Sequence, residues 1–544
     1  MKKFFKTSHL FYILFVLLLA VALTGCGAVK SKTKNSTKTN KTTITLGENI
    51  SIAGTGASVS KTTVLISKGG QYTVTGTLAD GQLIVDTKET VTLKLQNASI
   101  TNASGPALSI QNAKKTNIKL IEGTTNILTD GATNSDDEKG ALFTNDTLEI
   151  EGTGILTITG NYAHGIAGDD DIRIKEGTLV IKAKTDGIHA KDNITIDGGN
   201  ITIDCGSDGF ESEKDMVVNA GTISVTALDD GLHAATELNI NGGEITIAKS
   251  YEGLEAKNTL TINDGTVRIK AEDDALNAGK QLTVNGGYLY ADCDGDGLDS
   301  NGNMTINKGT CIVYSGNNAN GPVDVGDRGY TMEINGGTLL LAGGNMTVAA
   351  SDTSKQNSVW VYSNFAAGSL IHLAEEGGDS IATLKLAKSA SAFFFSSASL
   401  KTGKTYRAST GGTSDGKEKD GFYTSGTYSA GTDLGSFQIN SVSSSVGTST
   451  GGQGGMGGKG GNAGPGGTAP TGTPGENGAA TANGTGEGTP PSGTNGDKQG
   501  TPPNGGERGT PPTGANAKGT RPTAKSEKTT ASTADAVSGA TEKG

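Results

Sequence analysis

An acidic residue returns every 22 residues in the middle of this chain. The six members of this acidic column are Asp186, Asp208, Asp230, Glu252, Asp274 and Asp296. An apolar residue follows each acid two positions later, and a small residue follows two positions after that. A fixed period of this length is typical of an internal repeat, in which each unit buries its apolar face against the next unit. The sequence therefore predicts a stack of similar units.

Each unit predicts three short strands. In the unit that begins at Asp186, alternating apolar residues restart at Ile194 and Ile201, and no helical period is present. An Asn or Asp separates the second strand from the third at positions 197, 219, 241, 263, 285 and 307. We expect these residues to stack as a ladder, with a following Gly in the positive-φ region. The predicted fold is all-β, a right-handed parallel β-helix with 22-residue coils and three strands per coil.

The pattern also suggests how the chain is divided. It extends from about residue 42 to 350, and strands predicted at 359–362, 391–397, 405–409 and 421–428 suggest a β cap over residues 351–445. Residues 446–544 are rich in Gly, Pro and Thr, so we expect a disordered tail. Residues 1–25 are predicted to be a signal peptide, and 26–41 a linker. Leu23 to Cys26 resembles a lipobox, which predicts lipidation at Cys26; the alternative is an ordinary secretory signal with an incidental Cys.

The cysteines and the net charge narrow the possible partners. Cys205 and Cys293 occupy the same repeat position four units apart, and Cys311 replaces an apolar residue. We therefore expect three unpaired thiols, because stacked coils at about 4.8 Å would separate the first two too widely for a disulfide. The net charge of −11 argues against nucleic acid as a partner and favours bound cations. We expect a monomer.

The electrostatic repulsion within the acidic column must be offset by other interactions. Carboxylates about 4.8 Å apart on adjacent coils repel by roughly 1 kcal/mol in water and by up to about 3.5 kcal/mol at a dielectric constant of 20. Protonation, backbone N–H groups or cations could each offset this repulsion. Beside the column, His189, Glu211, His233, Glu255, Asn277 and Asp299 occupy an outward position. Their alternation predicts pairing between adjacent coils, a structural role for the histidines.

One acidic loop stands out. Asp292, Asp294, Asp296 and Asp299 lie within eight residues, with Gly between them, in a pattern that resembles calcium-binding loops. Backbone capping is the alternative for this loop. We expect other calcium ligands in the neighbouring acids of the repeat and in an upstream cluster. The full set of predicted metal ligands is Asp292, Asp294, Asp296, Asp299, Asp273, Asp274, Asp229, Asp230, Asp208, Asp186, Asp136 and Glu138.

The coils that begin at Asp186 and Asp208, the Ile-Asn-Gly-Gly turns, the segment from Asn126 to Leu142 and the lipobox together resemble a known family. It is the family of carbohydrate-binding β-helix proteins on the surfaces of Clostridia and related bacteria, and the likeness covers about residues 42–440. The resemblance implies a pectate-lyase-like fold, calcium, and binding of acidic plant polysaccharide or cellulose. It supports the acidic residues as calcium ligands and implies no catalytic residue.

A sugar-binding face is predicted on the third strand. Arg268, Lys270, Tyr288, Tyr290 and Tyr314 occupy outward positions on consecutive coils. Aromatic rings stack on sugars, and the cations would meet uronate carboxylates. The alternative is that these side chains only form cross-strand pairs on a solvated sheet.

These observations favour a non-catalytic, calcium-stabilised lipoprotein on the extracellular face of the cell membrane. It would bind a polysaccharide such as polygalacturonate or cellulose. Two alternatives stay open. A calcium-dependent polysaccharide lyase would need a basic side chain near the calcium, for which Arg268 is the nearest candidate. A purely structural or adhesive wall protein would keep the calcium without a sugar site.

Overall fold

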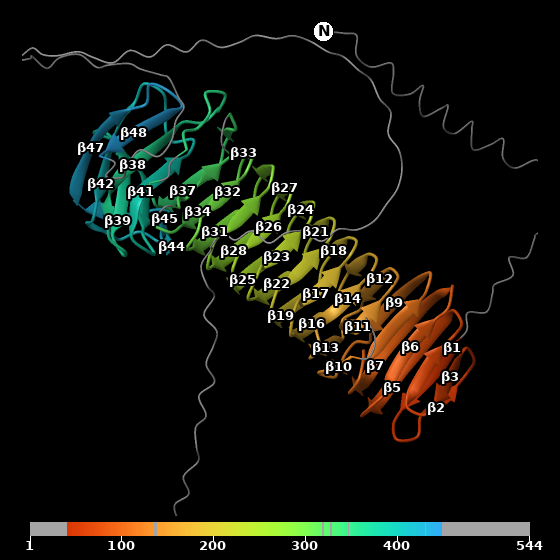
Figure 1. Ribbon diagram of the computed structural model, residues 1–544. Helices are drawn as coiled ribbons and strands as arrows, with labels where there is room; N and C mark the ends of the chain where they lie inside the picture. Colours follow the sequence, from red (N-terminus) through yellow and green to blue (C-terminus); the bar gives the residue numbers. More distant parts are fainter. Residues whose placement is uncertain are drawn as a thin grey trace, which may run out of the picture. The chain divides into compact units, whose positions relative to one another are not determined.

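The computed structural model describes residues 41–448 apart from 135–138, 318–319, 327–328, 346–347 and 430. Within these ranges every regular element is a β-strand, and no helix that could span a membrane is found. The strands stack coil upon coil along one axis, and further strands gather at the C-terminal end of the stack (Figure 1). The predicted all-β parallel solenoid is confirmed.

The first strands of the coils form a 13-stranded sheet, termed here the first face, which is parallel except for its opening hairpin. Its strands are β3 (Ala57–Ser60), β4 (Thr63–Ile66), β6 (Gln82–Asp86), β8 (Leu108–Asn112), β11 (Gly140–Thr144), β14 (His164–Gly168), β17 (Ile188–Ala190), β20 (Phe210–Ser212), β23 (Leu232–Ala234), β26 (Leu254–Ala256), β29 (Leu276–Ala278), β32 (Leu298–Ser300) and β35 (Asp324–Val325). Residues 22 apart are direct neighbours in its repeat region.

The second and third strands of the coils make two further columns. The long strand β7 (Thr90–Asn102) pairs with the first strand of each column and so joins both into one 27-stranded sheet. The second column contains β9 (Lys115–Leu120), β12 (Leu148–Glu151), β15 (Ile172–Ile174), β18 (Ile194–Ile196), β21 (Met216–Val218), β24 (Glu237–Ile240), β27 (Thr259–Ile262), β30 (Gln281–Val284), β33 (Asn303–Ile306) and β36 (Met332–Ile334). The third column, termed the third face, contains β10 (Thr125–Asp130), β13 (Ile155–Gly160), β16 (Thr178–Ala183), β19 (Asn200–Cys205), β22 (Thr222–Thr226), β25 (Glu244–Ser250), β28 (Thr266–Ala271), β31 (Tyr288–Cys293), β34 (Thr310–Tyr314) and β37 (Thr338–Gly343). At the N-terminal end, β1 (Lys41–Leu46), β2 (Ser51–Ala53) and β5 (Gly70–Leu78) extend the same sheet.

The predicted turn ladder is present. Each Asn donates from Nδ2 to the side-chain Oδ1 of the residue one coil earlier, at 2.7–3.0 Å. The ladder runs through Asp197, Asn219, Asn241, Asn263, Asn285, Asn307 and Asn335. Two residues after Asn241, Gly243 has a φ of 93°, a conformation that a side chain would strain. The turn sequence thus fixes the register of the coils.

The interior of the solenoid is apolar, and it includes the cysteines. Cys205, Cys293 and Cys311 are free and buried, as predicted. Burial raises the pKa of the Cys311 thiol to about 12, so this thiol stays neutral and acts as an apolar filler.

A C-terminal subdomain closes the end of the solenoid. Strand β41 (Ala390–Ser396) pairs antiparallel with β37, the last strand of the third face, and with β38 (Ser358–Phe365). The remaining strands are β39 (Leu370–Glu375), β40 (Ser380–Lys385), β42 (Thr405–Thr410), β43 (Thr413–Ser414), β44 (Glu418–Lys419), β45 (Phe422–Tyr423), β46 (Tyr428–Ser429), β47 (Thr432–Gln438) and β48 (Ser443–Gly447). The strand predicted over 421–428 is therefore wrong, because β45 and β46 are separate two-residue strands in different sheets.

Candidate functional site

The acidic column lies at the corner that leads into the first face. Asp186, Asp208 and Asp230 are 3–7% exposed. The carboxylates of Asp186 and Asp208 accept a hydrogen bond from the backbone N–H of the equivalent residue on the next coil: Asp208 N donates to Asp186 Oδ1 at 3.3 Å, and Asp230 N donates to Asp208 Oδ1 at 2.8 Å. The same link joins Asp296 N to Asp274 Oδ1 at 2.6 Å. Backbone capping is therefore one source of compensation for the column.

Capping does not neutralise the middle of the column. Burial and the charge of Asp208 raise the pKa of Asp230 to about 9, and burial with the charge of Glu255 raises the pKa of Glu252 to about 7. Asp229 approaches from the neighbouring loop, and its carboxylate lies within 4.8 Å of those of Asp208 and Asp230. These groups hold protons at pH values where exposed carboxylates are fully ionised.

Histidine and glutamate alternate along the outward column of the first face between His189 and Glu255, as predicted. His189 Nδ1 lies 2.8 Å from Glu211 Oε2 on the next coil, and His233 Nε2 lies 3.4 Å from Glu255 Oε2. Burial lowers the pKa of His189, but hydrogen bonds with Asp186 and Glu211 outweigh that effect and raise it to about 10. His189 is therefore a cation at neutral pH in the ion-free protein.

A second group of acids gathers at the C-terminal end of the column. We call Asp273, Asp274, Asp296, Asp299 and Asp324 the C-terminal carboxylate cluster. Asp299 and Asp324 are direct neighbours on β32 and β35. Burial, together with the charges of Asp274 and Asp324, raises the pKa of Asp299 to about 8. Burial likewise raises the pKa of Asp274 to about 7 and that of Asp296 to about 6, and neighbouring carboxylates in the cluster add to both shifts.

The loop between Asp292 and Asp299 does not act as one ligand set, which corrects its interpretation as a single calcium loop. Asp292 and Asp294 lie where the third face ends, and both pair with Lys388 of the C-terminal subdomain, at 2.7 and 2.9 Å. Asp296 and Asp299 belong to the carboxylate cluster on the first face. The chain turns a corner between the two pairs, so their side chains are on different sides of the coil.

Two carboxylates of the cluster, those of Asp273 and Asp274, lie close to Gly295. A Cβ atom on Gly295 would lie only 2.4 Å from Oδ1 of both Asp273 and Asp274, so this position admits two carboxylates only because it is a glycine. Calcium takes six to eight oxygen ligands. Within the cluster, Asp274, Asp296, Asp299 and Asp324 are the residues whose carboxylates could serve as such ligands. Asp136, Glu138 and Cys26 lie outside the described residues.

The predicted sugar face is mostly occupied by the protein itself, which corrects that prediction. Arg268 donates to both oxygens of Asp420 at 2.9 and 2.8 Å, and the Tyr288 hydroxyl donates to Asp420 Oδ2 at 2.5 Å. Tyr314 is 1% exposed, and its hydroxyl donates to the carbonyls of Lys385 and Asp420. These side chains hold the C-terminal subdomain against the third face.

Two residues of that prediction remain accessible. Tyr290 lines a groove of about 390 Å³ between the third face and the subdomain, together with Lys385 and Glu418. Lys270 is exposed and lies beside Asp292 in the register of the third face. Tyr290 is thus an aromatic residue of the predicted sugar face that lines a groove.

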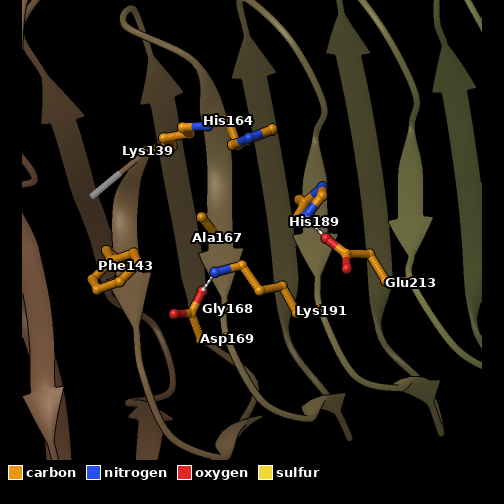
Figure 2. A pocket seen from close by; sticks show the side chains of 9 residues that line it. All are labelled: Lys139, Phe143, His164, Ala167, Gly168, Asp169, His189, Lys191 and Glu213. Carbon is orange, nitrogen blue, oxygen red and sulfur yellow. Dashed lines mark ion pairs between the residues drawn. The ribbon is translucent and has the colours of Figure 1, made fainter. Parts of the chain in front are cut away.

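A second groove, of about 200 Å³, lies on the outer surface of the first face (Figure 2). Lys139, Phe143, His164, His189 and Lys191 line it, with Asp169 and Glu213. His164 was not among the predicted site residues, although it precedes Asp186 by 22 residues and so occupies the acidic column one coil earlier. Extending the register backward by one coil would have found it.

A family profile described as carbohydrate-binding domain-containing protein matches residues 60–297 and 248–443. The chain belongs to this family. A carbohydrate-binding domain-containing protein of Acetivibrio thermocellus (strain ATCC 27405) is 32% identical over 179 residues, which are 31% of this chain and 63% of that relative. The chain thus spans slightly less than two thirds of the relative's length.

Among solved structures, a polysaccharide lyase-like protein from C. thermocellum, determined as a gadolinium derivative, is similar at 26% identity. The match covers 49% of this chain and 96% of that chain, with a TM-score of 0.37.

Proposed function

We propose that this carbohydrate-binding protein binds an acidic, uronate-containing polysaccharide through calcium held by the C-terminal carboxylate cluster, and that it does not cleave the chain. The observation that carries the proposal is the stacking of these acids on adjacent coils: Asp299 lies opposite Asp324, and the Asp296 N–H donates to Asp274 Oδ1. Burial raises the pKa values of Asp274, Asp296 and Asp299, in agreement with this stacking. Buried acids that raise one another's pKa make a site that a divalent cation would stabilise.

The net charge supports an acidic ligand that binds through a cation. At a formal charge of −11, the protein alone would repel a polyuronate chain. A calcium ion bound by three or four side-chain carboxylates still has room for other oxygen ligands, because its coordination number is six to eight. Uronate carboxylates would fill those positions, and calcium would then join two anions that otherwise repel each other.

The arginine contacts support a binding role over a lyase. A lyase needs a basic group free to remove the proton beside the uronate carboxylate. Arg268 is fixed by Asp420, and Arg173 pairs with Asp197 at 2.5 Å. Both guanidinium groups therefore form ion pairs within the protein, and neither is free to act as the base of a lyase.

The predicted lipobox supports a location at the outer side of the cell membrane, with Cys26 as the lipidated residue. The test is the mass of the mature N-terminus in membrane fractions. Diacylated Cys26 in the wild type and soluble, unmodified protein from Cys26→Ala would support this location, and an unmodified wild-type N-terminus would contradict it.

The glycan proposal is tested by incubating the full chain with polygalacturonate, in calcium and in chelator, while recording sedimented complex and absorbance of unsaturated products. Calcium-dependent co-sedimentation at constant absorbance is the expected result. Asp299→Asn should reduce it, and Asp294→Asn, which changes the same charge on an exposed residue outside the cluster, should not. Rising absorbance would identify a lyase, and equal binding in chelator would exclude the calcium bridge.

A further inference from the structure

The acidic column ends in a histidine at its N-terminal side. Strand β11 places Gly140 beside His164 of β14, and β14 in turn precedes Asp186 in the same register. His164 therefore faces Asp186 from the previous coil, while His189 faces it from the same coil, three residues later. This corner differs from the rest of the column, where a carboxylate occupies the equivalent of His164.

The three side chains converge closely. Asp186 Oδ2 lies 2.8 Å from His164 Nδ1 and 3.2 Å from His189 Nδ1. The two imidazole rings are 4.8 Å apart between centroids, and all three candidate ligand atoms lie within 4.8 Å of one another. Zinc binds nitrogen and oxygen ligands at about 2.0–2.2 Å, so tetrahedral ligand atoms lie about 3.3 Å apart. The observed spacing is close to that value.

The surrounding groups orient these ligands. The backbone N–H of Asp208 donates to Asp186 Oδ1 and leaves Oδ2 directed at the histidines. His189 Nε2 lies 3.3 Å from Glu213 Oε1, so a carboxylate holds the far side of the ring. Metal-binding histidines commonly donate their second ring nitrogen to such a carboxylate. Figure 2 shows Glu213 in this position next to His189.

The site is also accessible. Both imidazoles line the groove on the first face, which Lys139 also lines and where Lys191 pairs with Asp169 at 2.6 Å. The side chains of His164 and His189 are 13% and 17% exposed, whereas that of Asp186 is 5% exposed. An ion at this point would have a buried carboxylate behind it and open space in front for a water or substrate ligand.

We propose that His164, His189 and Asp186 form a binding site for a divalent transition-metal ion, with Zn²⁺ as the best-fitting class. Two imidazoles and one carboxylate favour such ions over calcium, which prefers oxygen ligands alone. His233 provides an internal comparison. Its surroundings repeat those of His189 two coils later, with Asp230 in place of Asp186 and Asp208 in place of His164, so it has only one imidazole.

The test is a calorimetric titration of Zn²⁺ into the full chain, purified without a histidine tag and kept in excess calcium. One Zn²⁺ per chain is expected, with an affinity at least about 100-fold weaker in His164→Gln and in His189→Gln, because losing a ligand costs more than losing its supporting group. His233→Gln should bind like the wild type. Titration with Co²⁺ should give visible absorption bands that the first two variants lose.

Two results would overturn the site: no Zn²⁺ binding by the folded wild type, or unchanged binding by folded His164→Gln and His189→Gln. Thermal melts in chelator establish that each variant folds, and testing the two substitutions separately guards against one of them failing to fold. The titration is done in saturating calcium and without glycan. Its failure therefore leaves the proposed polysaccharide binding untouched, and the failure of polysaccharide binding would leave the zinc site standing.

Discussion

Arg268 on the third face donates to both carboxylate oxygens of Asp420, 152 residues later in the chain. Tyr288 donates to the same carboxylate, and Lys419 lies 3.8 Å from the centre of the Tyr288 ring. Under these polar contacts, Ile312, Tyr314 and Leu340 of the solenoid pack into the core of the C-terminal subdomain. The subdomain is thus fixed to one face of the solenoid as well as to its end.

Removing this anchor should destabilise the C-terminal subdomain. We expect Asp420→Ala to lower its free energy of unfolding by about 2 kcal/mol, because a bidentate, charge-assisted pair is lost and Arg268 is left partly buried. Urea unfolding followed by the fluorescence of Trp360, the single tryptophan, measures this change. Glu418→Ala removes a more exposed carboxylate 3.7 Å from Lys385 and should cost less than about 0.5 kcal/mol. Equal effects of the two substitutions would contradict the anchor.

The asparagine ladder should contribute measurably at each rung. Asn241 both donates to Asn219 and accepts from Asn263. We expect Asn241→Ala to lower the free energy of unfolding by about 1–2 kcal/mol, because two side-chain hydrogen bonds are lost. Lys308→Ala, at an exposed position in a later turn of the same type, is the matched control and should change it by less than about 0.5 kcal/mol. If Asn241→Ala lowers the free energy of unfolding no more than the control does, the ladder is a consequence of the coil register and does not stabilise it.

The carboxylate cluster predicts a dependence of stability on pH that calcium should reverse. The pKa of Asp299 is raised from 3.8 to about 8 in the folded protein, so the folded state holds a proton that the unfolded state releases. This contribution is complete below about pH 4 and is lost as the pH rises through about 8. In chelator, the melting temperature should therefore fall between pH 5 and pH 9, and added calcium should restore it at pH 9.

Asp299→Asn isolates that contribution, because asparagine does not ionise. The fall in melting temperature between pH 5 and pH 9 should be smaller in this variant than in the wild type, and calcium should restore less of it. Asp294→Asn should retain the full wild-type fall. Identical pH profiles for the wild type and Asp299→Asn would show that Asp299 does not titrate in this range.

The regular part of the fold could be predicted because a 22-residue period repeats every contact. Once Asn241 is assigned to a turn, its neighbours in the ladder and the inward positions of each strand follow by adding or subtracting 22. The same arithmetic gave the alternation of His189 with Glu211. One step further back, 22 residues before Asp186, the same period reaches His164, a histidine in a column of acids, so the acid pattern alone does not indicate it.

The prediction of the sugar face was wrong because the C-terminal subdomain, which lies outside the repeat, covers most of that face. No local pattern around Arg268 indicates a partner 152 residues away. A signal was nevertheless present in the last coils: the runs 311–314 and 339–342 are continuously apolar, whereas the third strands over 200–205, 222–226 and 266–271 alternate. Continuous apolar runs are typical of strands that are buried on both faces. They mark where the subdomain packs.

The most direct test of the proposed function is the affinity of the full chain for polygalacturonate oligomers over a series of calcium concentrations. If calcium bridges protein and glycan, the affinity should rise with calcium and then level off, and Asp299→Asn should need about 10-fold more calcium to reach the same affinity. Asp294→Asn should follow the wild-type curve. An affinity that is the same in chelator and in saturating calcium would contradict the account.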